Sequence, residues 1–306
     1  MANARGQTTD KTHLSIDQAE VRGFLHRDYI AHCFRWSHIC KYLNEKNRYK
    51  KARILDVGCG KDMPLAKTLM TSRMSPELYL GIDFNKMDVP EMFWNTKFKP
   101  RLWAQTDFSK LILDNYKDEE YTRFNYTVCL EVLEHVEPWK AIKILRQIPH
   151  LTTDSAISWF STPCYDEKIG AAKNHVNEMT YHAFGALLEE YGYKILKHWG
   201  TFASIKDYKH ELEVNNYLDI FEKLRDYYDT NVLATIFAPC FPANARNVLW
   251  ETQYVGKLKL EERRFTPIRH QEGRWGSSER WRELCQEHDE APDLDGAGGK
   301  LMTKVP

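Results

Sequence analysis

Short apolar runs alternate with longer segments of helical spacing over most of this 306-residue chain. The short runs are rich in β-branched and aromatic residues and are bounded by glycine, proline and polar residues, which is typical of buried strands. The pattern predicts strands at 53–59, 78–84, 101–107, 125–132, 156–162, 193–200 and 247–255.

Helices are predicted between these strands, where apolar residues recur at every third or fourth position. They lie at 17–43, 64–70, 139–148 and 180–191, with a helical insertion at about 207–246. Strands that alternate with helices are joined by crossovers, which produce a parallel sheet covered on both faces. We therefore predict an α/β fold with a Rossmann-like, seven-stranded, mostly parallel sheet, helices on both faces and an antiparallel edge strand.

The polarity of the chain changes near both ends, which predicts three parts. Residues 1–16 are polar and are expected to be disordered. One domain is expected over 17–256. Residues 257–306 mix charges of both signs with few aliphatic residues, so we predict a polar, mostly disordered tail.

Composition indicates the expected partners and cellular compartment of the protein. The formal net charge is zero, whereas a general nucleic-acid binder carries an overall positive charge. A local basic stretch, "KNRYKKAR", is nevertheless present at 46–53. The seven cysteines form no CxxC pair, no secretory signal precedes the first helix, and no apolar run is long enough for a membrane span. These features predict a cytoplasmic protein with reduced thiols and no membrane association.

A glycine turn follows the first predicted strand, in "ILDVGCGKD". Gly58 and Gly60 permit a tight turn and let a ligand approach main-chain N–H groups. Asp83 ends the second strand, where a carboxylate accepts hydrogen bonds from ribose hydroxyls. A dinucleotide site needs a third glycine in the pattern GxGxxG, and this chain has Met63 there.

The turn belongs to a longer series of motifs that resembles the class I S-adenosylmethionine-dependent methyltransferases. After "ILDVGCGKD" come "GIDFN", "QTDF", "CLEVLEHV", "FSTPCYD" and "HVNEMTYHAFGALLEEYGYKI", in the order of that family and over about residues 25–255. The chain departs from the family pattern at Asp62, where many members have a glycine. The resemblance implies the family fold and the cofactor S-adenosyl-L-methionine.

The resemblance also implies which residues bind the cofactor. Asp56, Gly58 and Gly60 would line the methionine moiety and Asp83 would hold the ribose, while Glu131 would lie beneath the cofactor near the transferred methyl group. The expected cofactor-binding residues are completed by Asp107 and Phe108 at the adenine and by Arg35 at the cofactor carboxylate. A solvated helix face is the alternative interpretation of Arg35.

Glu131, Glu134 and His135 crowd into "CLEVLEHV", and three interpretations stay open. In the first, Glu134 lies near a helix N-terminus, where the helix dipole favours a negative charge, and His135 caps the helix or packs against it. His135 or His175 could act as a general base toward an acceptor hydroxyl. Alternatively, Glu131, Glu134, His135 and His175 hold Mg²⁺ or Mn²⁺, which would bind two vicinal hydroxyls. The catalytic candidates are thus His135, His175 and Glu134.

These observations predict O-methylation of a small-molecule, sugar or nucleotide-like acceptor. "ExxEH" with the later histidine also resembles the metal-dependent small-RNA 2′-O-methyltransferases, so an RNA or DNA acceptor is the alternative. A cofactor-binding but catalytically silent partner subunit is a second alternative. Cys164 follows the fifth strand rather than the fourth, so we interpret it as a structural thiol and not as the nucleophile of a cytosine-C5 enzyme.

Overall fold

A seven-stranded sheet forms the centre of the protein. The computed structural model describes residues 27–60, 63–84, 98–102, 123–265, 272–273 and 276–277. The strand order across the sheet is β3-β2-β1-β4-β5-β7-β6. The strands are β1 (Arg53–Val57), β2 (Leu78–Asp83), β3 (Phe98–Leu102), β4 (Phe124–Leu130), β5 (Thr152–Pro163), β6 (Tyr193–Phe202) and β7 (Asn247–Tyr254), and a separate hairpin pairs β8 (Glu272–Gly273) with β9 (Gly276–Ser277).

The predicted mostly parallel sheet is confirmed, with the antiparallel strand one place further in than expected. β7 pairs antiparallel with both β5 and β6, so β6 is the outermost strand. This arrangement places the first residue of β7 beside the last residues of two parallel strands: Asn247 faces Pro163 of β5 and Phe202 of β6. A side chain at position 247 therefore reaches the carboxyl edge of the sheet, where parallel strands present ligand-binding residues.

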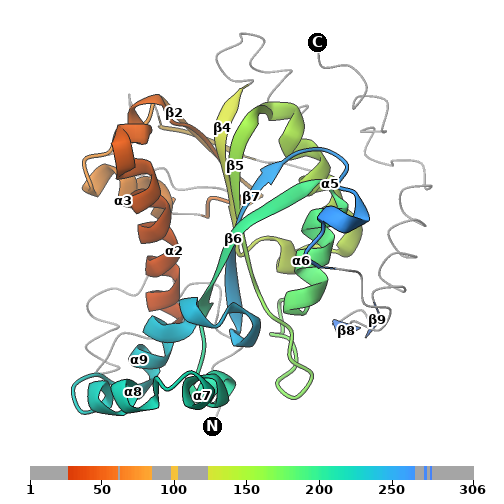
Figure 1. Cartoon of the computed structure of the whole chain (residues 1–306). Helices are drawn as coiled ribbons and strands as arrows, with labels where there is room; N and C mark the ends of the chain where they lie inside the picture. The colour runs from red at the N-terminus through yellow and green to blue at the C-terminus, as the bar shows by residue number, and fades with distance from the viewer. Residues whose placement is uncertain are drawn as a thin grey trace.

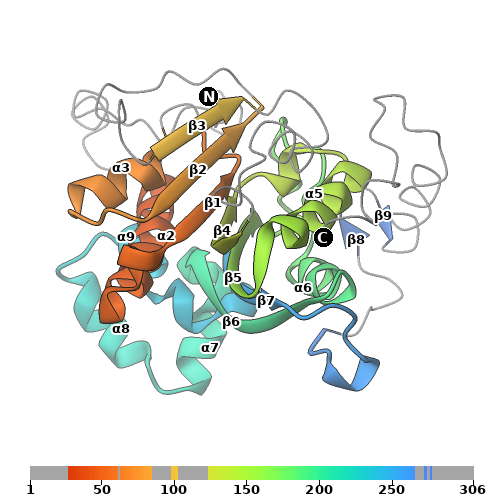
Figure 2. The same ribbon diagram turned by 90° about the horizontal axis from the view of Figure 1, so that it is seen from above.

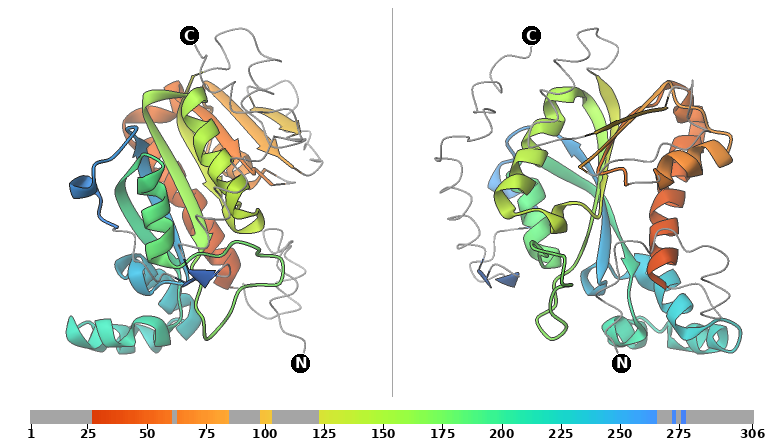
Figure 3. Two further views of the ribbon diagram at one scale, coloured as in Figure 1. Left: turned by 90° about the vertical axis from the view of Figure 1, so that its right-hand side faces the viewer. Right: turned by 180° about the vertical axis from the view of Figure 1, so that it is seen from behind.

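Helices cover both faces of the sheet, as predicted (Figures 2 and 3). α2 (Arg27–Asn44) and α3 (Pro64–Thr71) lie on one face, and α5 (Pro138–Leu151) and α6 (Tyr181–Glu190) lie on the other. Each pair buries its apolar stripe against the sheet and forms a separate core. No helix in the described ranges combines the length and the apolarity that crossing a bilayer requires.

The predicted helical insertion forms a small subdomain of its own. It contains α7 (Ile205–Val214), α8 (Leu218–Arg225) and α9 (Thr230–Phe237), which pack around the buried Tyr208 and Phe221. The subdomain follows β6 and precedes β7, so it lies at the carboxyl edge of the sheet, toward the bottom of Figure 1.

The chain beyond β7 remains packed for longer than the predicted boundary at residue 256. Phe265 is 8% exposed and lies over Gly185 of α6, where a Cβ atom would be 2.7 Å from its ring. The buried Glu189 carboxylate accepts hydrogen bonds from the N–H groups of Arg264 and Phe265, at 2.9 and 2.8 Å. The folded part therefore continues through Phe265, because an aromatic anchor and two charge-assisted hydrogen bonds attach it to α6.

Candidate active site

Residues far apart in the sequence meet at the carboxyl edge of the sheet. The glycine turn follows β1, Glu131 follows β4, and the segment 164–178 follows β5. This is the edge at which open α/β sheets bind ligands. The predicted adenine contacts, Asp107 and Phe108, lie outside the described residues.

The glycine turn has the backbone that its sequence predicts. Gly58 and Gly60 have φ angles of 73° and 74°, in the left-handed region that favours glycine. A Cβ atom on Gly58 would lie 2.3 Å from Cγ2 of Val132, so both the backbone angle and the close approach of a neighbour require glycine. The Gly60 N–H donates to Oδ2 of Asp83 at 2.9 Å. Asp83 thus supports the turn from the end of β2.

Asp56 ends up almost fully buried beneath this turn, at 4% exposure. The Tyr79 hydroxyl donates a hydrogen bond to its Oδ2 atom. Burial raises the pKa of the Asp56 carboxyl to about 7, although the hydrogen bond from Tyr79 opposes that rise. Sequence analysis did not identify Tyr79, because an aromatic residue in an apolar strand is indistinguishable from an ordinary core residue.

The raised pKa of Asp56 predicts a specific dependence of stability on pH. A carboxyl whose pKa is higher in the folded than in the unfolded protein loses stabilisation as pH rises from the unfolded value, near 4, to the folded value, about 7. We expect Asp56→Asn to remove much of this decline, so that the variant gains up to about 4 kcal/mol relative to the wild type between pH 4 and pH 8. Urea unfolding of both proteins at several pH values measures this difference in the free energy of unfolding. If the free energy of unfolding changes with pH in the same way for both proteins, the raised pKa of Asp56 is contradicted.

Glu131 occupies a strained position at the end of β4. Its φ angle is 57°, which is uncommon for a residue with a side chain and occurs often at functional sites. Its carboxylate accepts hydrogen bonds from Ser161 Oγ at 2.7 Å and from Asn247 Nδ2 at 2.9 and 2.8 Å. About a fifth of its side chain (19%) is exposed. Glu131 is therefore held from one side and accessible from another.

Arg35 is the cation beside Glu131, and its burial excludes one of the two interpretations of the arginine. Its side chain is 2% exposed, so it is not on a solvated helix face, and its Nη2 atom lies 3.6 Å from Oε2 of Glu131. The Arg35 charge is therefore matched within the protein by Glu131, and its pairing with the cofactor carboxylate stays a prediction. Burial by itself raises the pKa of the Glu131 carboxyl, but Arg35 and the surrounding hydrogen-bond donors outweigh burial and lower the pKa to about 2.

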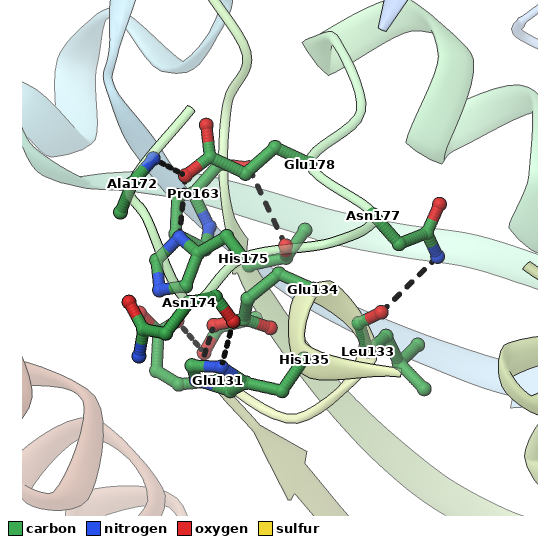
Figure 4. A network of polar contacts seen from close by, with 12 residues as sticks. Glu131, Leu133, Glu134, His135, Pro163, Ala172, Asn174, His175, Asn177 and Glu178 are labelled. Atoms are coloured by element: carbon green, nitrogen blue, oxygen red, sulfur yellow. Dashed lines mark hydrogen bonds and ion pairs between the residues drawn. The ribbon is translucent and has the colours of Figure 1, made fainter. Parts of the chain in front are cut away.

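Glu134, His135 and His175 converge in Figure 4, and their ligand atoms all lie within 4.8 Å of one another. Glu134 is fully buried, yet neither of its carboxylate oxygens has a hydrogen-bond partner in the described part of the chain. The nearest cationic candidate is His135, whose Nε2 lies 3.8 Å from Glu134 Oε1. Burial, and then the charge of Glu131, raise the pKa of Glu134 well above its usual value.

Both histidines have their Nδ1 atoms occupied by acceptors. His135 Nδ1 lies 3.1 Å from the carbonyl oxygen of Asn174, and His175 Nδ1 contacts Oε1 of Glu178. Glu178 is itself fixed by the Ala172 N–H, at 3.1 Å. In metal-bound histidines an acceptor at one ring nitrogen orients the ring so that the other nitrogen faces the ion. Burial, and then His175, lower the pKa of His135, which favours its neutral form.

The segment that carries His175 is attached directly to the one that carries Glu134. The Asn177 N–H donates to the carbonyl oxygen of Glu134 at 3.0 Å, and Asn177 Nδ2 donates to Leu133 at 3.1 Å (Figure 4). α5 begins only at Pro138, with Glu137 as its N-cap residue. Glu134 and His135 lie in the short 3₁₀ helix η5 (Leu133–His135), which precedes α5, so their placement near a helix N-terminus stays a prediction beside the other two.

Three of the four predicted metal ligands come together, and Glu131 does not join them. Its oxygens accept hydrogen bonds from Ser161 and Asn247 instead. Sequence analysis did not assign Glu178, although its spacing from His175 is visible in "HVNE". The role of Asn174 depends on its backbone carbonyl and therefore has no signal in the sequence.

The basic stretch 46–53 lies away from this site. Most of it belongs to the short helix η2 (Glu45–Lys51), which directly precedes β1 and so lies at the amino-terminal edge of the sheet. Arg48 is paired with Glu45 at 3.0 Å and Arg53 with Glu77 at 2.9 Å. The stretch therefore lies at the edge opposite the candidate site.

Several solved structures are similar to this chain at low sequence identity. The 1,6-didemethyltoxoflavin-N1-methyltransferase of Burkholderia thailandensis is 14% identical, with 72% of this chain and 78% of that one covered and a TM-score of 0.43. The magnesium protoporphyrin IX methyltransferase of Synechocystis PCC 6803 is 13% identical, with 79% and 89% covered and a TM-score of 0.45. The methyltransferase domain of bacterial CtHen1 is 14% identical, with 73% and 99% covered and a TM-score of 0.44. Likenesses this distant say nothing about the acceptor of this chain.

The family is established by a match along the sequence. No curated protein matches the chain significantly. A family model described as "Methyltransferase domain" matches residues 29–198, more than half of the chain, from α2 through the glycine turn and both histidines into β6. The chain therefore belongs to the methyltransferase-domain family, and it is a class I S-adenosylmethionine-dependent methyltransferase.

Proposed function

We propose that this enzyme methylates a hydroxyl oxygen of an acceptor that carries vicinal hydroxyl groups, with a divalent ion held by Glu134, His135 and His175. The observation that carries the proposal is the Glu134 carboxylate, which is fully buried and lacks any hydrogen-bond partner in the described residues. An uncompensated buried carboxylate is costly. A cation between Glu134 and the two Nε2 atoms would compensate it.

The ligand types fit Mg²⁺ or Mn²⁺. One carboxylate and two neutral imidazoles leave further coordination positions for oxygen atoms from the acceptor. When bound, such an ion supplies charge that lowers the pKa of a coordinated hydroxyl. Glu178 would hold the His175 imidazole in one orientation, and the Asn174 carbonyl would do the same for His135. In this arrangement both histidines act as ligands rather than as general bases.

The cofactor is proposed to lie along the same edge, over the glycine turn. Gly58 and Gly60 leave room for the methionine part, with Asp56 beneath, and Asp83 stands at the end of β2 for the ribose. Glu131 would border the methyl group from the end of β4. Methyl transfer is a displacement on an already activated carbon, so alignment of the acceptor oxygen with the methyl group is the main contribution of the protein.

A small or nucleotide-like acceptor agrees better with the charges than a long nucleic acid does. The basic stretch 46–53 lies at the opposite edge of the sheet and part of it is already paired. A small acceptor predicts turnover that changes little with salt, whereas a long polyanion predicts a steep loss of affinity with rising salt.

The proposal is tested by metal titration and by turnover. Electron paramagnetic resonance of Mn²⁺ added to the metal-free enzyme should show one bound ion per chain, independently of any acceptor. Release of S-adenosylhomocysteine with catechol or adenosine as probe acceptor should stop on chelation and return with Mg²⁺ or Mn²⁺, and analogues with one hydroxyl removed should not react. Turnover that survives chelation would overturn the proposal.

Glu178→Gln tests the support of His175. We expect the affinity for Mn²⁺ to fall by about 10- to 100-fold, because a neutral amide is a weaker acceptor for the Nδ1 proton and can donate instead of accept. Mn²⁺ titration of the variant measures this. Glu167→Gln, at an exposed position in the same segment, is the matched control and should bind Mn²⁺ like the wild type. Equal affinities for the two variants would contradict the role of Glu178.

A further inference from the structure

Asn247 connects Glu131 to the buried cation on α2. Its Nδ2 group donates to both carboxylate oxygens of Glu131, at 2.9 and 2.8 Å. Its Oδ1 atom accepts from Arg35 Nη1 at 2.9 Å and from Thr201 Oγ1 at 2.7 Å. Residues from α2, β6, β7 and the position after β4 thus form one network around a single amide group, and position 247 lies outside the residues 29–198 that the family model matches.

The network fixes which way the amide points. Arg35 and Thr201 supply the two donors to Oδ1, so the NH₂ group must face Glu131. Asn247 is 5% exposed, and Arg35 is 1% exposed. Because the amide is buried and each of its two ends has partners, rotation would leave donors facing donors, which is costly in a buried site. Glu131 is therefore held in one orientation, with about a fifth of its side chain (19%) exposed.

We propose that Asn247 is a positioning residue of the cofactor site, which acts by holding the Glu131 carboxylate in place. The inference rests on the proposed placement of the cofactor beside Glu131. It assigns Glu131 to the cofactor and not to the metal, because the amide and Ser161 hold the carboxylate apart from the cluster of Glu134, His135 and His175. The left-handed backbone of Glu131 indicates a second constraint on the same side chain.

The test compares two ligands on the same variants. Asn247→Leu removes the donor at similar size, and Asn247→Asp replaces the donor with a second carboxylate that faces Glu131. For both variants we expect calorimetric titration with S-adenosylhomocysteine to show a dissociation constant raised by about 10- to 100-fold, the effect of losing hydrogen bonds to a charged group. The Mn²⁺ affinity should stay within about threefold of the wild type, because Glu131 is outside the metal cluster.

Two comparisons distinguish a positioning role of Asn247 from a general contribution to stability. Asn125→Leu is the matched control, since the Asn125 side chain also joins two segments, through Arg53 N–H at 2.9 Å and Lys51 C=O at 2.8 Å, but at the opposite edge of the sheet. It should lower the melting temperature without changing S-adenosylhomocysteine affinity. In addition, Asn247→Leu should add little to the effect of Glu131→Gln, because two residues that act through one contact are not additive.

Three outcomes would overturn the inference. They are unchanged S-adenosylhomocysteine binding by Asn247→Leu, an equal loss of Mn²⁺ and S-adenosylhomocysteine binding, and full additivity with Glu131→Gln. A wild type that binds S-adenosylhomocysteine but no Mn²⁺ would instead refute the proposed metal site, and the comparisons with Asn125→Leu and Glu131→Gln would still decide the role of Asn247.

Discussion

Replacing Glu134 with glutamine is expected to abolish divalent-ion binding and to lower turnover by at least about 100-fold. Glu134 provides the one carboxylate of the candidate cluster, and an amide oxygen carries no charge to balance the ion. The metal-free variant should melt no lower than the metal-free wild type, since a neutral amide costs less to bury than an unpartnered carboxylate. Mn²⁺ resonance, S-adenosylhomocysteine release and thermal melting measure the three effects.

Glu137→Gln is the matched control for Glu134→Gln. Glu137 is three positions further along and forms an exposed ion pair with Lys140 at 3.0 Å, so its loss should change stability by less than about 1 kcal/mol and leave Mn²⁺ binding intact. S-adenosylhomocysteine binding should survive in both variants, because the cofactor turn is separate from the cluster. If Glu134→Gln keeps wild-type turnover, the metal site is wrong.

Gly58→Ala is expected to prevent cofactor binding, with S-adenosylhomocysteine affinity lowered by more than about 100-fold, and to lower the melting temperature. The left-handed backbone alone costs a residue with a Cβ about 1–2 kcal/mol. The added methyl group would also lie 2.3 Å from Val132 Cγ2, so the turn or the segment after β4 must move. Calorimetry with S-adenosylhomocysteine and thermal melting measure the two effects.

Alanine substitutions at two other glycines distinguish the cost of backbone strain from the cost of the steric clash with Val132. Gly60 has nearly the same φ angle, but among the described residues its Cβ would meet only Pro64 Cδ, at 3.8 Å. Gly170 has a φ angle of 69°, and no atom of the described residues would lie within 4 Å of its Cβ. Alanine at either position should cost only the backbone strain, and alanine at Gly170 should leave S-adenosylhomocysteine binding unchanged. Equal losses of stability at Gly58 and Gly170 would show that Val132 imposes no restriction.

The sequence predicted the elements well because their signals are local. Apolar runs and helical spacing placed most strands and helices to within a few residues, and the glycines at 58 and 60 were expected in the left-handed turn that they form. The strand predicted at 101–107 overlaps β3 only at residues 101 and 102, and residues 17–26 of the helix predicted at 17–43 lie outside the described residues. The place of β7 inside the sheet was not predicted, because strand order depends on pairing between distant segments. The packing of Phe265 on α6 has little signal in the sequence, because charged residues precede this single anchor.

The sequence by itself determined the family, the glycine turn and the set of ionisable residues available for chemistry. Only the tertiary structure decided which of them work together: His175 joins Glu134 and His135, while Glu131 binds Asn247 and faces Arg35. The physical reason is that a motif determines only the side chains at the end of one strand. Their partners lie on or after β5, β7 and α2, and the positions of these elements follow from the packing of the whole sheet. Charges that are close in the sequence therefore have different partners in the folded protein.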